Sequence, residues 1–147
     1  VDTVYPTLPD DLWEAITSPE RLARWFGELV PRSDEATVYD ATLTTGWSGP
    51  IRVDQCEPTR VIRVTLLDED PSAVTTVTAV LDATDGGTRL TIEERGLPTE
   101  DLPTYVAGWH AQLDQLHADF SGAPAIEWRP RWEHLRETYR NNQMSQR

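Results

Sequence analysis

The sequence predicts an α+β fold in which a curved antiparallel β-sheet wraps around one long C-terminal helix, with two short helices after the first strand. Helical patterns stand near both ends of the chain, at residues 9–27 and 102–121, and the segment between them carries strand patterns separated by short turns. Because no helical pattern interrupts those strands, we expect them to pair as an antiparallel meander. A sheet closed by one long helix is a shape that makes a cavity.

The N-terminal part predicts a strand followed by two short helices. Residues 2–5 have a strand pattern, and Pro9 fits the first turn of a helix. Ser18 is expected to cap a second helix, with Pro19 at its first position. Gly27 is expected to end that helix.

The middle of the chain predicts five strands, at residues 37–43, 50–57, 60–67, 74–83 and 88–95. The run Asp85-Gly86-Gly87 predicts a hairpin between the last two, because glycine accepts positive φ at little cost. Alternation places Leu90 and Ile92 on one face of the last strand, and Glu94 continues that apolar row. A carboxylate in this position is the most informative local exception of the sequence.

The C-terminal part predicts two amphipathic helices. In the first, apolar residues recur at steps of three and four, at Val106, Trp109, Leu113, Leu116 and Phe120. A similar stripe, Trp128, Trp132, Leu135 and Tyr139, follows in the tail. We expect residues 1–121 to form one domain, and residues 122–147 to form an extension whose helix packs on that domain or on a partner subunit. Packing on its own domain is the favoured alternative, and a homodimer stays open.

Composition restricts the classes of partner. The 147 residues suffice for one domain with a full core, and a net charge of −12 disfavours both nucleic acid and anionic membrane surfaces. All thirteen basic residues are arginine, so lysine Schiff-base chemistry and a Walker-type phosphate loop are excluded. The single cysteine, Cys56, excludes an internal disulfide. No apolar run is long enough to span a membrane, and we expect a cytoplasmic location.

Four segments in order carry a family resemblance: LWEAITSPERLARWFG, CEPTRVIRVTL, GGTRLTIEERGLP and YVAGWHAQLDQLHADF. They resemble the START-like helix-grip (SRPBCC) superfamily, and within it the bacterial branch related to the C-terminal domain of the activator of Hsp90 ATPase. The resemblance implies an apolar cavity between the sheet and the C-terminal helix. Members of the superfamily bind lipids, polyketides or hormones, and some are cyclases, aromatases or hydrolases. Relatives often carry a polar residue such as histidine where this chain has Glu94.

On this basis the first functional hypothesis is binding of a small hydrophobic or amphipathic ligand. The expected ligand-binding residues combine aromatic and aliphatic contact surface with two polar side chains: Trp25, Phe26, Trp47, Leu66, Glu94, Trp109, His110 and Leu113. An enzyme of cyclase or hydrolase type, with Glu94 or His110 as acid or base, is the second hypothesis. A chaperone-linked protein-interaction module is the third. A Glu94 that simply reaches solvent or forms an ion pair remains the plainer alternative.

A metal site on the long helix is a further alternative. His110, Asp114 and His117 follow one another at steps of four and three, so they share one side of a helix. Without a further ligand, chance spacing on an amphipathic helix is the favoured explanation. We therefore expect neither a metal nor another cofactor.

Overall fold

The structure is a computed structural model that describes residues 1–124 and 126–145. It confirms the predicted α+β class: a seven-stranded antiparallel sheet with two short N-terminal helices and long C-terminal helices, in a helix-grip-like element order. The chain divides into two compact units, Val1–Leu97 and Pro98–Arg147. None of the described helices is long and apolar enough to cross a membrane.

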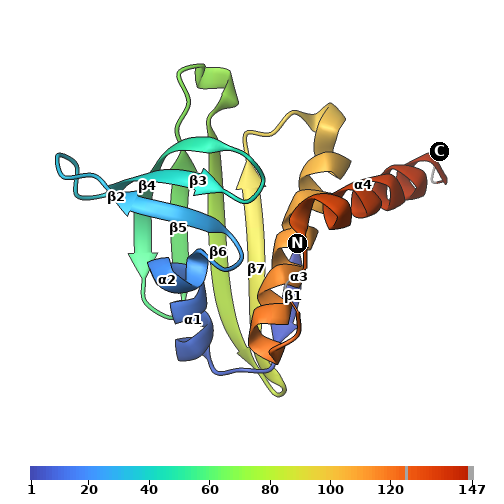
Figure 1. Ribbon diagram of the computed structural model, residues 1–147, viewed down its shortest axis with the longest axis horizontal. Helices are drawn as coiled ribbons and strands as arrows, with labels where there is room; N and C mark the ends of the chain where they lie inside the picture. Colours follow the sequence, from blue (N-terminus) through green and yellow to red (C-terminus); the bar gives the residue numbers. More distant parts are fainter. Residues whose placement is uncertain (125, 146–147) are drawn as a thin grey trace. The chain divides into compact units, whose positions relative to one another are not determined.

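The first unit contains the sheet, whose strand order is β1-β7-β6-β5-β4-β3-β2. Six strands therefore follow one another as the expected meander, and β1 joins the far edge beside β7 (Figure 1). The strands are β1 (Asp2–Tyr5), β2 (Gly27–Pro31), β3 (Val38–Leu43), β4 (Ser48–Glu57), β5 (Val61–Leu66), β6 (Thr75–Thr84) and β7 (Gly87–Arg95).

Strand β2 is absent from the five predicted strands of the middle segment. The stretch is short and ends in Pro31, which cannot donate to a sheet hydrogen bond, so its local pattern is weak. It forms because it pairs with β3 alone at the sheet edge. The expectation that Gly27 ends the second helix is wrong, because α2 already ends at Leu22 and Gly27 is the first residue of β2. It lies close to the partner strand: a Cβ there would be 2.5 Å from the carbonyl oxygen of Thr42.

The register gives the sheet one apolar and one polar face. Val64 lies opposite Val77, and Ala79 lies opposite Ile92, so their side chains share the apolar face. Arg63 lies opposite Thr78, and Thr78 opposite Glu93, so these side chains share the polar face. A row of buried threonine, valine, alanine and leucine side chains along β6 alternates with half-buried ones, as expected for a strand with one covered face.

Two short helices belong to the first unit, α1 (Pro9–Thr17) and α2 (Pro19–Leu22). Each begins with proline at its first position, as the sequence predicts. Helix α1 buries Leu12, Ala15 and Ile16 and contacts β6 and β7. Ser18 makes no side-chain capping bond, although its carbonyl accepts the backbone N–H of Leu22.

The predicted hairpin between β6 and β7 is present, with Thr84 paired to Gly87. Its glycines act differently from the expectation. Only Gly87 of the pair has a positive φ, and a Cβ at Gly87 would collide with the carbonyl oxygen of Tyr5. Glycine is thus required at this position both by its backbone conformation and by the close approach of β1.

The second unit contains two helices, α3 (Leu102–Ser121) and α4 (Trp128–Ser145), which pack against each other. Helix α3 ends at Gly122, whose φ of 70° is the left-handed conformation typical of a helix C-terminus. A small core lies between the helices, with Ala107 and Ala111 of α3 against Trp128 and Leu135 of α4. The alanines of α3 let the tryptophan side chains of α4 approach its backbone closely.

Candidate ligand-binding surface

Three of the predicted ligand-binding residues meet in one apolar cluster on the apolar face of the sheet. The buried centre of this cluster is formed by Ala41, Leu43 and Ile51. Five partly buried side chains surround the centre: Phe26, Leu29, Trp47, Val64 and Leu66. We call these eight residues the sheet cluster. They come from four strands and two connecting segments, so only the folded sheet assembles them.

The turn between β3 and β4 places Trp47 in the sheet cluster. Gly46 adopts a φ of 95°, and the carbonyl of Trp47 accepts the backbone N–H of Leu43 at 2.9 Å, which folds the chain back on itself. The ring of Trp47 then lies against Gly49, where a Cβ would come within 3.0 Å of two ring carbons. Gly46 thus shapes the turn, and Gly49 leaves room for the ring of Trp47.

Trp25 is buried beside the cluster, with 3% of its surface exposed. Its indole nitrogen donates to the carbonyl oxygen of Ala15 at 2.9 Å, which ties α1 to the segment after α2. The rings of Trp25 and Phe26 are tilted, with centroids 5.4 Å apart. Trp25 therefore positions Phe26 and has its one polar atom satisfied within the protein.

Glu94 lies on the apolar face of the sheet, as the alternation predicts. It is opposite Val77 in the register and is half-buried. Its neighbours along the same face of β7 are Ile92 and Leu90, both buried. A half-buried carboxylate in an apolar row can accept a hydrogen bond from a polar ligand group.

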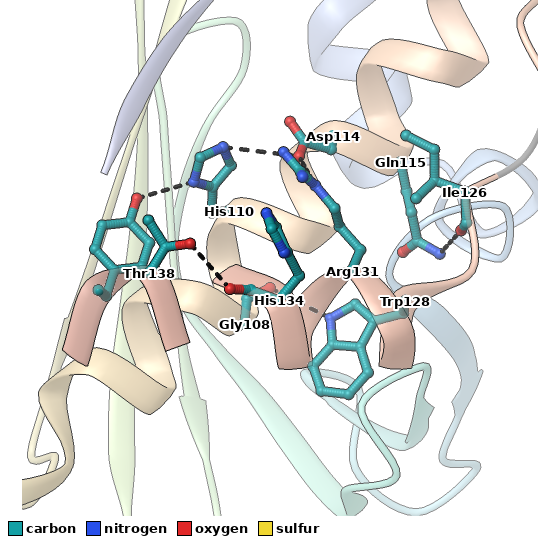
Figure 2. A network of polar contacts seen from close by, with 10 residues as sticks. Gly108, His110, Asp114, Gln115, Ile126, Trp128, Arg131, His134 and Thr138 are labelled. Atoms are coloured by element: carbon teal, nitrogen blue, oxygen red, sulfur yellow. Dashed lines mark hydrogen bonds and ion pairs between the residues drawn. The ribbon is translucent and has the colours of Figure 1, made fainter. Parts of the chain in front are cut away.

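In the second unit, His110 belongs to a polar network between α3 and α4. Its Nδ1 lies 2.8 Å from the hydroxyl oxygen of Tyr139, and its Nε2 lies 3.7 Å from Asp114 Oδ2. Arg131 of α4 donates to the same carboxylate oxygen at 2.9 Å. Figure 2 shows His110, Asp114 and Arg131 in this network. Both ring nitrogens of His110 thus face partners within its own unit.

Burial shifts the pKa values of two further side chains in this unit, Tyr139 and His117. Burial raises the pKa of Tyr139, the nearby carboxylate of Asp114 raises it further, and Arg131 opposes the change. The phenol therefore keeps its proton at neutral pH. Burial lowers the pKa of His117, with Asp114 acting in the opposite direction. No three His, Cys, Asp or Glu side chains among the described residues are arranged to hold a metal ion.

Trp109 and Leu113 lie on the side of α3 away from the residues that contact α4. Leu113 is buried and Trp109 is half-buried. Gln112, one turn from Trp109, is 3% exposed, and its Nε2 has no hydrogen-bond partner within the described part of the chain. Gln112 was not among the predicted site residues. The signal that points to it is an amide within the apolar stripe of α3.

A family model matches most of the chain. Residues 6–120 match the family described as activator of Hsp90 ATPase homolog 1-like protein. The chain belongs to this family. The match covers most of the chain, so the resemblance seen in the sequence is confirmed, and AHSA1-like membership places the chain in the START-like (SRPBCC) superfamily. Helix α4 lies beyond the part that matches the AHSA1-like model.

Several solved structures resemble this AHSA1-like chain. CalU16 from Micromonospora echinospora is 26% identical, with a TM-score of 0.73, over 95% of this chain and 84% of CalU16. DynU16, from the dynemicin biosynthetic locus, is 27% identical, with a TM-score of 0.73, over 88% of this chain and 49% of DynU16, so the chain spans about half of that protein. BPP1335 from Bordetella parapertussis shares the fold, with a TM-score of 0.76. It is 18% identical, over 95% of this chain and 82% of BPP1335. A comparison with curated proteins finds no match.

Proposed function

We propose that the chain binds a small apolar or amphipathic molecule, with the sheet cluster as its main contact surface. The observation that carries the proposal is the gathering of five partly buried apolar side chains around a buried centre on one face of the sheet. Large side chains that are only partly buried retain apolar area for a ligand, and burying that area stabilises a complex by about 25 cal/mol per Å² before the costs of association. Phe26 and Trp47 supply the largest flat surfaces in the cluster.

Glu94 supports an amphipathic rather than a purely apolar ligand. Its carboxylate is half-buried on the same apolar face as the sheet cluster, where it can accept a hydrogen bond from a polar ligand group. The expectation that sheet and C-terminal helix act on one ligand stays a prediction of the family resemblance.

The relatives agree with a small-molecule role. DynU16, at 27% identity, comes from a biosynthetic locus. The alternative of acid–base catalysis by Glu94 and His110 gains no support, because both ring nitrogens of His110 face groups of the second unit. A chaperone-linked role rests on family membership alone.

The first experiment is native mass spectrometry of the purified full chain, followed by denaturing extraction. We expect a co-purified small organic molecule of apolar or amphipathic character. The second experiment is a fluorescence titration with N-phenyl-1-naphthylamine, a neutral apolar probe. Saturable binding is expected, with a dissociation constant in the micromolar range, which corresponds to about −8 kcal/mol.

A matched pair of variants tests whether the ligand binds at the sheet cluster. Leu66 lies in the sheet cluster, whereas Val80 is a half-buried aliphatic residue on the polar face of the neighbouring strand. Leu66→Gln should weaken probe binding about tenfold, because an amide replaces apolar contact area. Val80→Gln should leave the affinity unchanged. Equal effects of the two variants, or a probe that never saturates, would contradict the proposal.

A further inference from the structure

The polar face of the sheet carries two rows of side chains that cross neighbouring strands. In one row Thr65 lies beside Thr76, and Thr76 lies beside Arg95. In the next row Arg63 lies beside Thr78, which in turn lies beside Glu93. The surface here forms an open hollow of about 510 Å³, lined by Asp54, Arg63, Thr76, Thr78, Glu93 and Arg95.

A β-bulge brings a carboxylate to the rim of this hollow. The register of β4 against β5 shifts between Val53 and Gln55, so Asp54 is the extra residue. Asp54 accepts hydrogen bonds from the hydroxyl of Thr65 and from Arg52, the latter at 2.7 Å, and its side chain is 18% exposed. Burial would raise the pKa of Asp54, but the bonds from Thr65 and Arg52 hold that pKa below its usual value. Asp54 is therefore a charged carboxylate that already has partners in Arg52 and Thr65.

Some hydrogen-bond donors at the hollow have no partner within the described residues. The guanidinium of Arg95 is paired with Glu93, and Arg52, which lies outside the lining, is paired with Asp54. The guanidinium of Arg63, by contrast, makes no hydrogen bond within the described residues, and acts on the carboxylate of Asp54 through its charge alone, which helps to lower the pKa of Asp54. The hydroxyls of Thr76 and Thr78, on the next strand, likewise make none within the described residues. Two arginine–carboxylate pairs thus flank one available guanidinium and two available hydroxyls.

We propose that this hollow binds a small soluble oxyanion, a carboxylate or phosphate group, through Arg63 with the hydroxyls of Thr76 and Thr78. A planar guanidinium matches such anions with two parallel hydrogen bonds, and neighbouring hydroxyls supply further donors. The site lies on the face opposite the sheet cluster, so it is independent of the apolar ligand proposed above.

The charges that line the hollow balance one another, although the chain is acidic. Arg63 and Arg95 stand against Asp54 and Glu93, in a chain whose net charge is −12. At physiological ionic strength, charges beyond about 8 Å are largely screened, so the nearby groups decide binding. The overall negative charge disfavours an anionic membrane surface as the source of the oxyanion.

The test is a nitrogen-15 NMR titration of the full chain with inorganic phosphate, and separately with succinate, in HEPES buffer at 150 mM sodium chloride. Arg63→Gln removes the available guanidinium. Arg60→Gln is the matched control, because Arg60 is exposed in the neighbouring turn outside the lining of the hollow. Thr78→Val removes one hydroxyl with little change of shape, and a spectrum like that of the parent chain checks that each variant folds.

We expect saturable shifts confined to β4–β7, with a millimolar dissociation constant for at least one of the two anions. Arg63→Gln should weaken binding at least tenfold, since a charge-assisted hydrogen bond contributes more than a neutral one. Thr78→Val should weaken it about two- to fivefold, and Arg60→Gln should bind like the parent chain. Shifts spread over the whole surface, or equal losses in the Arg63 and Arg60 variants, would overturn the proposal. Absence of saturation with both anions would overturn it as well.

Discussion

The ring of Trp47 lies directly over Gly49, so that a Cβ on Gly49 would come within 3.0 Å of ring carbons Cζ2 and Cη2. Trp47 lies in the turn just before β4, and its ring folds back over Gly49 to join the sheet cluster. The absent side chain at Gly49 is what lets a loop tryptophan reach the sheet cluster. Substitution at Gly49 is therefore a way to move Trp47 without changing it.

Gly49→Ala should displace the ring of Trp47 by a few tenths of an ångström and lower the free energy of unfolding by about 1 kcal/mol. It should also weaken binding of N-phenyl-1-naphthylamine, because the largest surface in the cluster moves. Gly86→Ala is the matched control, since Gly86 has no left-handed φ and nothing within 4 Å of its Cβ position. Urea unfolding and probe titration of both variants check this prediction. An unchanged affinity for the Gly49 variant would remove Trp47 from the ligand surface.

Gly108→Ala should stabilise the second unit. A Cβ at this position of α3 would meet the rings of Trp128 and Trp132 at 3.8 Å, which is an ordinary contact distance. Alanine in a helix interior is favoured over glycine by about 0.5–1 kcal/mol. Gly122→Ala should have the opposite sign, because Gly122 holds a left-handed φ of 70° at the helix end. Chemical unfolding followed by circular dichroism measures both, and a shared sign would refute the argument.

Tyr139→Phe should weaken the packing of α4 on α3. The substitution removes only the hydroxyl that lies 2.8 Å from His110 Nδ1, and such a bond contributes about 0.5–1.5 kcal/mol. Thr138→Val is a suitable control, because the hydroxyl of Thr138 is exposed and bonds only to the carbonyl one turn earlier in its own helix. We expect the control to change the free energy of unfolding by less than about 0.5 kcal/mol. Urea unfolding of the two variants decides the matter.

Acidification should destabilise the second unit through His117. Burial lowers the pKa of this histidine below the value of 6.5 that the unfolded chain has, against a smaller opposing effect of Asp114. The stabilising contribution is therefore complete above pH 6.5 and is lost as the pH falls through the folded-state pKa. His117→Gln should flatten the loss of thermal stability between pH 7.5 and 5.5. His134→Gln, at an exposed position of α4, should preserve the slope of the parent chain.

Local sequence patterns predicted most of the elements. The prolines at the first positions of α1 and α2, and the glycine after α3, mark helix boundaries with residues whose backbone preferences act without tertiary contacts. The strands from β3 to β7 were likewise found from alternation. Strand β2 was missed because its five residues, ending in Pro31, become a strand only by pairing with β3.

The sequence by itself determined the α+β class, the family, the apolar stripe of α3 and the place of Glu94 in an apolar row, because each follows from the period of a helix or a strand. The tertiary structure decided which side chains meet. Phe26, Trp47 and Leu66 join in one cluster through strand register, and His110 pairs with Tyr139, 29 residues away, through the packing of α4. Strand register likewise places Arg63 beside Thr78, and that neighbour cannot be inferred from the sequence around Arg63. Contacts of this kind depend on non-local pairing, which no local pattern encodes.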